Sequence, residues 1–141
     1  MSDKKKFELH VPSVLGCEKV AMEFAASVAK AMDFSADRIE DLKTAVAEAC
    51  TNAIEHGNKM DAATKVGVTL TVVNGRLQVD VEDEGRGVGM VKTPDIDSKM
   101  AGDGDRRGWG IFLINSLMDE VTFESTPEGK NVVKMIIHLE R

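Results

Sequence analysis

A chain of 141 residues is long enough for one domain with a single hydrophobic core, and we expect residues 1–141 to form one. Its composition, 43% hydrophobic and 30% charged residues, is that of an ordinary globular protein, while the net charge of −6 argues against a general nucleic-acid binder. The longest apolar run is only a few residues, which excludes a membrane-spanning helix, and the N-terminus lacks the pattern of a signal peptide.

The first part of the chain predicts one strand and two helices. Apolar residues alternate with polar ones from 7 to 11, as in a half-buried strand, and Ser13 is the expected N-cap of a helix that runs to about Met32. Ser35 is expected to cap the second helix, and Gly57 is of the residue type that suits the left-handed position at its end. The second helix has an apolar stripe of Ile39, Leu42, Val46, Ala49 and Ala53.

A hairpin is predicted after the second helix. Residues 65–73 and 77–81 alternate between apolar and polar types, which is typical of strands with one buried face. Between them, Asn74 and Gly75 suit the two positive φ angles of a type I′ turn. The returning strand delivers Asp83 at its end, directly before a glycine-rich turn.

The remaining residues predict a loop, a helix and a final hairpin. Residues 88–105 are rich in Gly, Asp and Lys and lack periodicity, which indicates a mobile segment. A helix is expected from about Trp109 to Leu117, followed by short strands at 121–123 and 133–137. Helices that alternate with hairpins in this order predict an α+β fold, a two-layer sandwich with a mostly antiparallel mixed sheet.

The two cysteines, Cys17 and Cys50, fall in apolar helical patterns without the CxxC spacing of redox and metal sites. The three histidines are scattered along the chain, so a zinc-type cluster is not expected. We therefore expect two buried, reduced thiols, a location in the cytoplasm, and no direct contact with nucleic acid or membrane.

Glu48 and Asn52 are the most informative pair of polar residues. They are four positions apart, so a helix places both side chains on one face. A carboxylate beside an amide suits a proton acceptor next to an oxygen ligand for a hard cation such as magnesium. The alternatives are a solvated Glu48 on an amphipathic helix and an Asn52 that belongs to a buried polar network.

Further candidate groups follow this pair. His56 lies one turn beyond Asn52, where a cation near the helix end is also favoured by the helix dipole alone. Asp83 is followed by Gly85 and Gly87, which would leave the backbone open to a ligand, although turn chemistry explains such glycines equally well.

A second glycine-rich segment offers an anion site. Gly108 and Gly110 flank Trp109 just ahead of the predicted third helix, where free backbone N–H groups bind anions readily. Arg106 and Arg107 precede this position, and we expect them to contact phosphate. Together with the acidic and amide residues upstream, these groups predict a nucleotide site.

The order and spacing of these segments resemble the GHKL ATPase superfamily, whose nucleotide-binding domain has the Bergerat, or histidine-kinase-like ATPase, fold. The resemblance covers essentially the whole chain. Within the superfamily the chain is most similar to the small anti-sigma factor serine/threonine-protein kinases. The counterparts of the N box, the G1 box and the G2 box are Glu48-x-x-x-Asn52, Asp83-x-Gly85-x-Gly87 and Gly108-x-Gly110.

The resemblance implies a role for each site residue. Glu48 would be the catalytic base that takes a proton from a serine hydroxyl, and Asn52 would hold the Mg²⁺ that bridges the phosphates of ATP. Asp83 would accept a hydrogen bond from the adenine amino group, and about 88–107 would form a lid over the nucleotide. The other implied nucleotide contacts are His56, Gly85, Gly87, Arg106, Arg107, Gly108 and Gly110.

The resemblance further implies a function: an ATP-dependent kinase that sequesters a sigma factor and phosphorylates a serine on its STAS-type anti-anti-sigma antagonist. A homodimer through the first strand and helix is expected on the same basis. The alternatives are an ATP-binding regulatory module without kinase activity, a switch kinase that binds no sigma factor, and a detached histidine kinase catalytic domain. Glu48 favours phosphoryl transfer to a serine, because a binding module needs no base and sensor histidine kinases typically carry Asn there.

Overall fold

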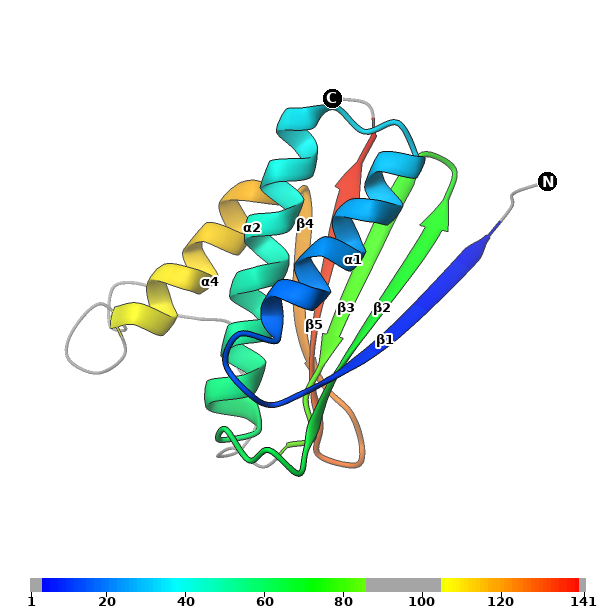
Figure 1. Ribbon diagram of the computed structural model, residues 1–141. Coiled ribbons are helices and arrows are strands. Elements are labelled where there is room, and N and C mark those ends of the chain that lie inside the picture. Colours follow the sequence, from blue (N-terminus) through cyan, green and yellow to red (C-terminus); the bar gives the residue numbers. More distant parts are fainter. Residues whose placement is uncertain (1–3, 86–104, 140–141) are drawn as a thin grey trace.

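Five strands form one antiparallel sheet, and the helical layer lies on one of its faces (Figure 1). The computed structural model describes residues 4–85 and 105–139, to which the statements below refer. The sheet order is β1-β2-β3-β5-β4, and every pairing between neighbours in it is antiparallel, so the predicted α+β sandwich is confirmed. The strands are β1 (Lys5–Pro12), β2 (Lys65–Val73), β3 (Arg76–Glu82), β4 (Glu120–Ser125) and β5 (Asn131–His138).

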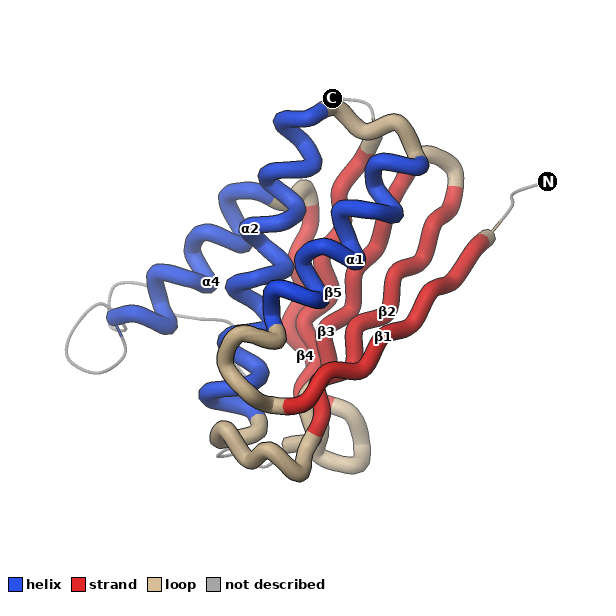
Figure 2. Tube along the Cα trace, viewed as in Figure 1, coloured by secondary structure: helices blue, strands red, loops and turns tan. Residues whose placement is uncertain are grey.

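The central helix is α2 (Ala36–Asn52), which packs between α1 (Glu18–Ala31) and α4 (Asp105–Leu117), as the tube in Figure 2 makes visible. Ser35 is its N-cap, as predicted, because the Ser35 Oγ accepts a hydrogen bond of 3.2 Å from the backbone N–H of Arg38. At its other end α2 continues directly into a π-helical turn, η1 (Ala53–Gly57). Such turns inside helices are frequent at functional sites.

The core lies between the helices and the inner face of the sheet. The predicted stripe of α2 faces it, with Leu42, Val46, Ala49 and Ala53 buried. The β2–β3 turn has φ angles of 49° at Asn74 and 73° at Gly75, which confirms the predicted pair of positive φ angles. This turn fixes the register of β2 against β3. Alternate residues of the two strands therefore point into the core, namely Val66, Val68, Leu70, Leu77, Val79 and Val81.

Asp119 fixes the connection between α4 and β4 to the rest of the fold. Its Oδ2 accepts a hydrogen bond of 2.9 Å from the Arg38 guanidinium and one of 2.7 Å from the backbone N–H of His138. The Arg38 and Asp119 side chains are 18% and 11% exposed, so this ion pair is screened less than one on the surface. The start of α2, the end of α4 and β5 are therefore held at one point.

The prediction that Ser13 caps the first helix is wrong. The helix begins at Glu18, and its N-cap residue, Cys17, makes no side-chain capping bond. Ser13 is buried instead, where its Oγ accepts hydrogen bonds of 2.9 Å from both Asn58 Nδ2 and Thr64 Oγ1. A tertiary polar contact thus takes the side chain that local sequence assigned to a cap.

The start of the third helix also differs from the prediction. α4 begins at Asp105, so Gly108 and Gly110 lie inside it, and not in a loop just ahead of a helix at Trp109. Glycine disfavours a helix interior by about 1 kcal/mol relative to alanine, which is why the sequence indicated a later start. Packing outweighs this cost here, because both glycines are buried in a helix that packs on α2.

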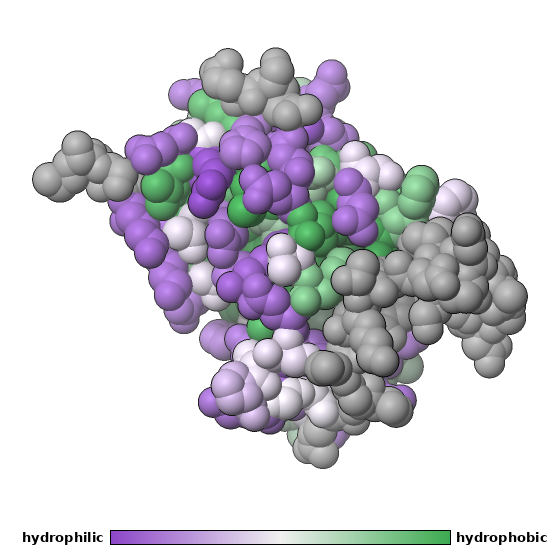
Figure 3. Space-filling view, turned by 180° about the vertical axis from the view of Figure 1, so that it is seen from behind, coloured by the Kyte–Doolittle hydropathy of each residue, from purple (hydrophilic) through white to green (hydrophobic). Residues whose placement is uncertain are grey.

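The outer face of the sheet carries no helix, and Figure 3 shows a mainly hydrophilic surface with scattered apolar side chains on this side. Polar residues from four strands line a shallow hollow there, among them Lys6, Thr71, Gln78 and Lys134. In residues 4–85 and 105–139, no helix combines the length and the apolar character needed to cross a bilayer.

Cys50 lies in α2 with its side chain fully buried, whereas Cys17 is partly exposed. Burial, with a smaller contribution from the Glu18 carboxylate, raises the pKa of the Cys50 thiol from its ordinary value of 9.0 to about 12. Both cysteines are free thiols, as predicted, but only Cys50 is fully buried.

We expect iodoacetamide to label Cys17 in the native protein and Cys50 only after unfolding, because the buried thiol stays protonated. A raised folded-state pKa stabilises the fold fully below about pH 9 and loses that contribution as the pH rises toward 12. Mass spectrometry checks the labelling, and Cys50→Ala should flatten the alkaline decline of the unfolding free energy. Rapid labelling of Cys50 in the native protein at pH 8 would contradict this account.

Candidate functional site

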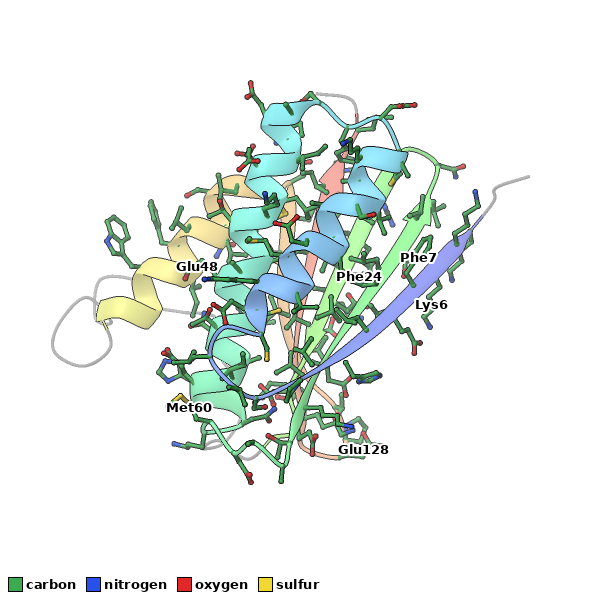
Figure 4. The ribbon with its side chains drawn as sticks, in the orientation of Figure 1. Lys6, Phe7, Phe24, Glu48, Met60 and Glu128 are labelled. Carbon is green, nitrogen blue, oxygen red and sulfur yellow. The ribbon has the colours of Figure 1, made fainter. Side chains whose placement is uncertain are left out.

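Glu48 and Asn52 lie on one side of α2, half-buried, as their spacing predicts. Figure 4 shows Glu48 on the side of α2 that is turned toward α4. A Cβ added at Gly110 of α4 would stand 2.5 Å from Glu48 Oε1 and 3.8 Å from Asn52 Nδ2. The structure therefore brings together the N-box pair and a G2-box glycine, which are more than fifty residues apart in the sequence.

These residues border an open pocket of about 220 Å³ between α2 and α4. His56 lies in its wall, with Nε2 3.8 Å from an oxygen of the Glu55 carboxylate. The pocket therefore combines acidic, amide and imidazole groups with apolar side chains of α4. Its lining residues are Glu48, Thr51, Asn52, Glu55, His56, Trp109, Gly110 and Leu113.

A second, smaller cavity of about 20 Å³ lies on the other side of Asn52, toward the sheet. Its walls are mainly apolar, and include Ala53, Ile111 and Phe123. Asp83 and Asn131 are its polar residues besides Asn52 itself. Asn52 lines both spaces. Its amide therefore stands between a mostly apolar cavity with the buried Asp83 carboxylate and an open polar pocket with the carboxylates of Glu48 and Glu55.

Asp83 occupies the end of β3, as predicted, and is only 5% exposed. Its Oδ1 accepts a hydrogen bond of 2.7 Å from the backbone N–H of Gly85 and one of 3.3 Å from the backbone N–H of Asn131. The Asn131 amide donates to both carboxylate oxygens, at 3.3 Å each. The carboxylate is thus held in one orientation by the turn that follows it and by the start of β5.

Asn131 was missed in the sequence analysis, although it is 5% exposed and touches the predicted site. The available signal was a polar residue at the first position of a mostly apolar final strand. Its relevance depends on the pairing of β3 with β5, which sets Glu82 opposite Val132 and so places the start of β5 beside Asp83. The residues next to Asn131 in the sequence do not reveal this pairing, because β3 lies far away along the chain.

Gly57 has a different role from the predicted one. It does not adopt a positive φ, and Lys59 and Met60 are the residues that do, at 56° and 57°. A Cβ at Gly57 would overlap the carboxylate of Asp83, so the glycine is required by the close approach of η1 to the end of β3. Gly85 is constrained in both ways, because its φ is 75° and a Cβ there would overlap the carbonyl oxygen of Gly129.

Comparison with known proteins identifies the family. The family model for the histidine kinase-like ATPase domain matches residues 15–137. The chain belongs to the histidine kinase-like ATPase domain family. This confirms the resemblance stated from the three motifs, and the matched range includes the whole site described above.

Two relatives in sequence and one solved structure are similar to this chain. The serine-protein kinase RsbW of Bacillus licheniformis is 38% identical, over 68% of this chain and 63% of that protein. The anti-sigma F factor of Bacillus velezensis is 28% identical, over 98% of this chain and 95% of that protein. The crystal structure of the RsbU and RsbW domains of a Mycobacterium tuberculosis protein matches with a TM-score of 0.69 at 15% identity. That match covers 96% of this chain and 32% of the other, and it bears on the fold alone.

The donor set of the ATPase domain fits a magnesium nucleotide. Carboxylate and amide oxygens are ligands that Mg²⁺ prefers, and neither Glu48 nor Asn52 uses its side chain in a hydrogen bond to another described residue. Among the described residues, no group of three or more His, Cys, Asp and Glu side chains could hold a metal by itself. Phosphate oxygens and water would have to complete the coordination of a cation at Asn52, which is usual for Mg²⁺.

Several predicted site residues cannot be compared with the structure. Gly87 and the predicted lid up to residue 104 lie outside the described residues. Arg106 and Arg107 fall in the first turn of α4, but their side chains are not described. Their contacts with phosphate stay predictions.

Gly57 and Gly110 of the ATPase domain should respond differently to substitution by alanine. Gly57→Ala should lower the unfolding free energy by about 1–3 kcal/mol, because the new Cβ meets the entire Asp83 side chain down to its own Cβ. Gly110→Ala should leave the unfolding free energy near that of the wild type, because the new Cβ comes too close only to the far end of the flexible Glu48 side chain and meets Asn52 Nδ2 at an ordinary 3.8 Å. Urea denaturation measures both values. Equal stability of the two variants would contradict the assigned role of Gly57.

Proposed function

We propose that the chain is an ATP-dependent serine-protein kinase that also acts as an anti-sigma factor. The observation that carries this proposal is the position of Glu48, whose carboxylate lies in the same pocket as Asn52 and against Gly110 of α4. The two relatives described above, a serine-protein kinase and an anti-sigma F factor, support the same two activities. The chain aligns with less than two thirds of the B. licheniformis kinase, so its substrate and partners are part of the proposal.

Nucleotide binding would use the cavity beside the sheet for the base. Asp83 is buried, and its carboxylate accepts hydrogen bonds but donates none. It therefore suits a ligand group that donates, such as the adenine amino group. The Asn131 amide beside Asp83 donates to both carboxylate oxygens and so helps to orient the carboxylate. A cavity of about 20 Å³ has room for a single water, so it must widen when a base binds.

The open pocket would take the phosphates and the acceptor serine. Bound Mg-ATP supplies the transferable γ-phosphoryl group and a cation that neutralises phosphate charge. Asn52 would hold the cation through its amide oxygen, since it lines both the base cavity and the open pocket. Glu48 would take the proton from the serine hydroxyl as the oxygen attacks, which requires only that the serine enter the pocket that Glu48 lines.

Two other functions differ from this one by a single step. A nucleotide-gated binding module would keep Asp83 and Asn52 but would have no use for a carboxylate at position 48. Glu48 therefore favours the kinase over the binding module. A kinase that phosphorylates an antagonist without meeting a sigma factor uses the same site, and only identification of the bound partners separates it from the proposed function.

The proposed partners are a sigma factor, a STAS-type antagonist that carries the acceptor serine, and a second copy of the chain, all in the cytoplasm. The support for a homodimer is the edge of the sheet at β1, whose strand pairs with β2 alone among the described strands. Next to this edge, Phe7, Leu15 and Val20 are exposed apolar residues. Sedimentation equilibrium tests the dimer, and a monomer at all concentrations would contradict it.

Glu48→Gln should leave the affinity for Mg-ATP close to that of the wild type and lower phosphoryl transfer about a hundredfold or more, because the amide cannot take a proton. Asn52→Ala should instead weaken Mg-ATP binding itself, and this loss should shrink when magnesium is omitted. Calorimetry measures binding. Transfer is followed with γ-labelled ATP and the antagonist that co-purifies with the chain from its native cell.

Equal loss of Mg-ATP binding in the two variants would contradict the separate roles of base and ligand. Binding without any labelled serine in the wild type would favour the nucleotide-gated module, and Glu48 would then need another explanation.

A further inference from the structure

Asn58 is a fully buried polar residue directly after η1, and no motif in the sequence marks it. Its side-chain nitrogen donates a hydrogen bond of 2.9 Å to Ser13 Oγ and one of 3.1 Å to the carbonyl oxygen of Lys65. Its side-chain oxygen accepts a hydrogen bond of 2.7 Å from the backbone N–H of Glu84. One amide thus joins the end of the central helix to three other segments of the chain.

The bond to Glu84 is the one that concerns the nucleotide site. The N–H of Glu84 belongs to the peptide group that follows Asp83, so holding it fixes the backbone from which the Asp83 side chain extends. The preceding residue, Gly57, packs against the Asp83 carboxylate itself. Gly57 and Asn58 at the helix end therefore contact Asp83 and Glu84 of the turn. Gly57 allows the close approach because it has no side chain, and Asn58 accepts a hydrogen bond from Glu84.

The same turn is fastened from a second direction. The Glu84 carboxylate accepts a hydrogen bond of 2.7 Å from the backbone N–H of Lys65, whose carbonyl oxygen is bonded to Asn58. Lys65, Glu84 and Asn58 thereby form a closed set of three residues. A loop held on both sides loses less conformational entropy when a ligand binds, which is the physical basis of preorganisation.

A purely structural explanation would be that a buried amide must have its hydrogen bonds satisfied. Thr64 provides the comparison, because it is also buried and belongs with Ser13 and Asn58 to one polar cluster. Its hydroxyl oxygen lies 2.6 Å from the carbonyl oxygen of Asp61 and 2.9 Å from Ser13 Oγ, both within hydrogen-bond distance, and neither contact reaches the turn after β3. Among the described residues, Asn58 is the member of this cluster that bonds to that turn.

We propose that Asn58 is a positioning residue of the nucleotide site, which holds the Asp83–Glu84 peptide so that the Asp83 carboxylate is oriented before a nucleotide arrives. The inference rests on the proposed function for the identity of the ligand. Asn58 itself is not proposed to touch the nucleotide, because its side-chain amide makes its three hydrogen bonds to Ser13, Lys65 and Glu84.

The test is the dissociation constant for Mg-ADP, measured by calorimetry on the full chain at a temperature where circular dichroism shows each variant folded. Asn58→Ala should raise the constant about tenfold, which corresponds to the loss of roughly one well-formed hydrogen bond. The control Thr64→Val removes a hydroxyl from the same cluster and should change it by less than about twofold. An unchanged constant in Asn58→Ala, or an equal rise in both variants, would overturn the proposal.

A second measurement needs no variant. Amide hydrogen exchange on the wild type should find the N–H of Glu84 protected without nucleotide, although Glu84 is an exposed residue, because Asn58 already accepts from it. An unprotected Glu84 amide would overturn the preorganised contact. A wild type that fails to bind Mg-ADP at all would instead refute the proposed function, so the two failures can be told apart.

Discussion

The approach of the helix end at Gly57 to the carboxylate of Asp83 sets the geometry on which the rest of the site depends. The N-box residues lie along α2 and the G1 turn follows β3, so this contact fixes one half of the site against the other. It leaves no space for a methyl group, which makes it sensitive to a single added carbon. The bond from the Glu84 N–H to Asn58 lies next to it and holds the same turn.

A looser contact lies on the side of α2 that faces α4. Gly110 brings the backbone of α4 against Glu48 and Asn52, and the ion pair of Arg38 with Asp119 holds the far end of the same two helices. The central helix therefore presents a carboxylate and an amide to a pocket whose opposite wall is α4. Such an arrangement suits phosphoryl transfer, in which the protein mainly positions groups and stabilises charge.

Much of the fold follows from local sequence. The five strands, the turn at Asn74 and Gly75, and the cap at Ser35 were all predictable, because periodicity and turn chemistry act over a few residues. So was the shared face of Glu48 and Asn52, which requires only helical spacing.

The misassigned residues have one physical property in common: packing partners far along the chain determine what they do. Ser13 bonds to Asn58 and Thr64, Gly57 makes room for Asp83, and the glycines of α4 are tolerated where that helix is buried. Asn58 and Asn131 were missed because a single polar residue in an ordinary context carries no pattern. Their roles become visible only when the pairing of β3 with β5 places Asn131 beside Asp83, and the end of η1 places Asn58 beside Glu84.

The most direct test of the account is a crystal structure of the chain with magnesium and a non-hydrolysable ATP analogue. We predict that the adenine amino group lies within hydrogen-bond distance of Asp83, that the cation is coordinated by Asn52, and that the γ-phosphate points into the pocket lined by Glu48. A nucleotide bound away from Asp83, or with its γ-phosphate on the far side of α2 from Glu48, would contradict the account.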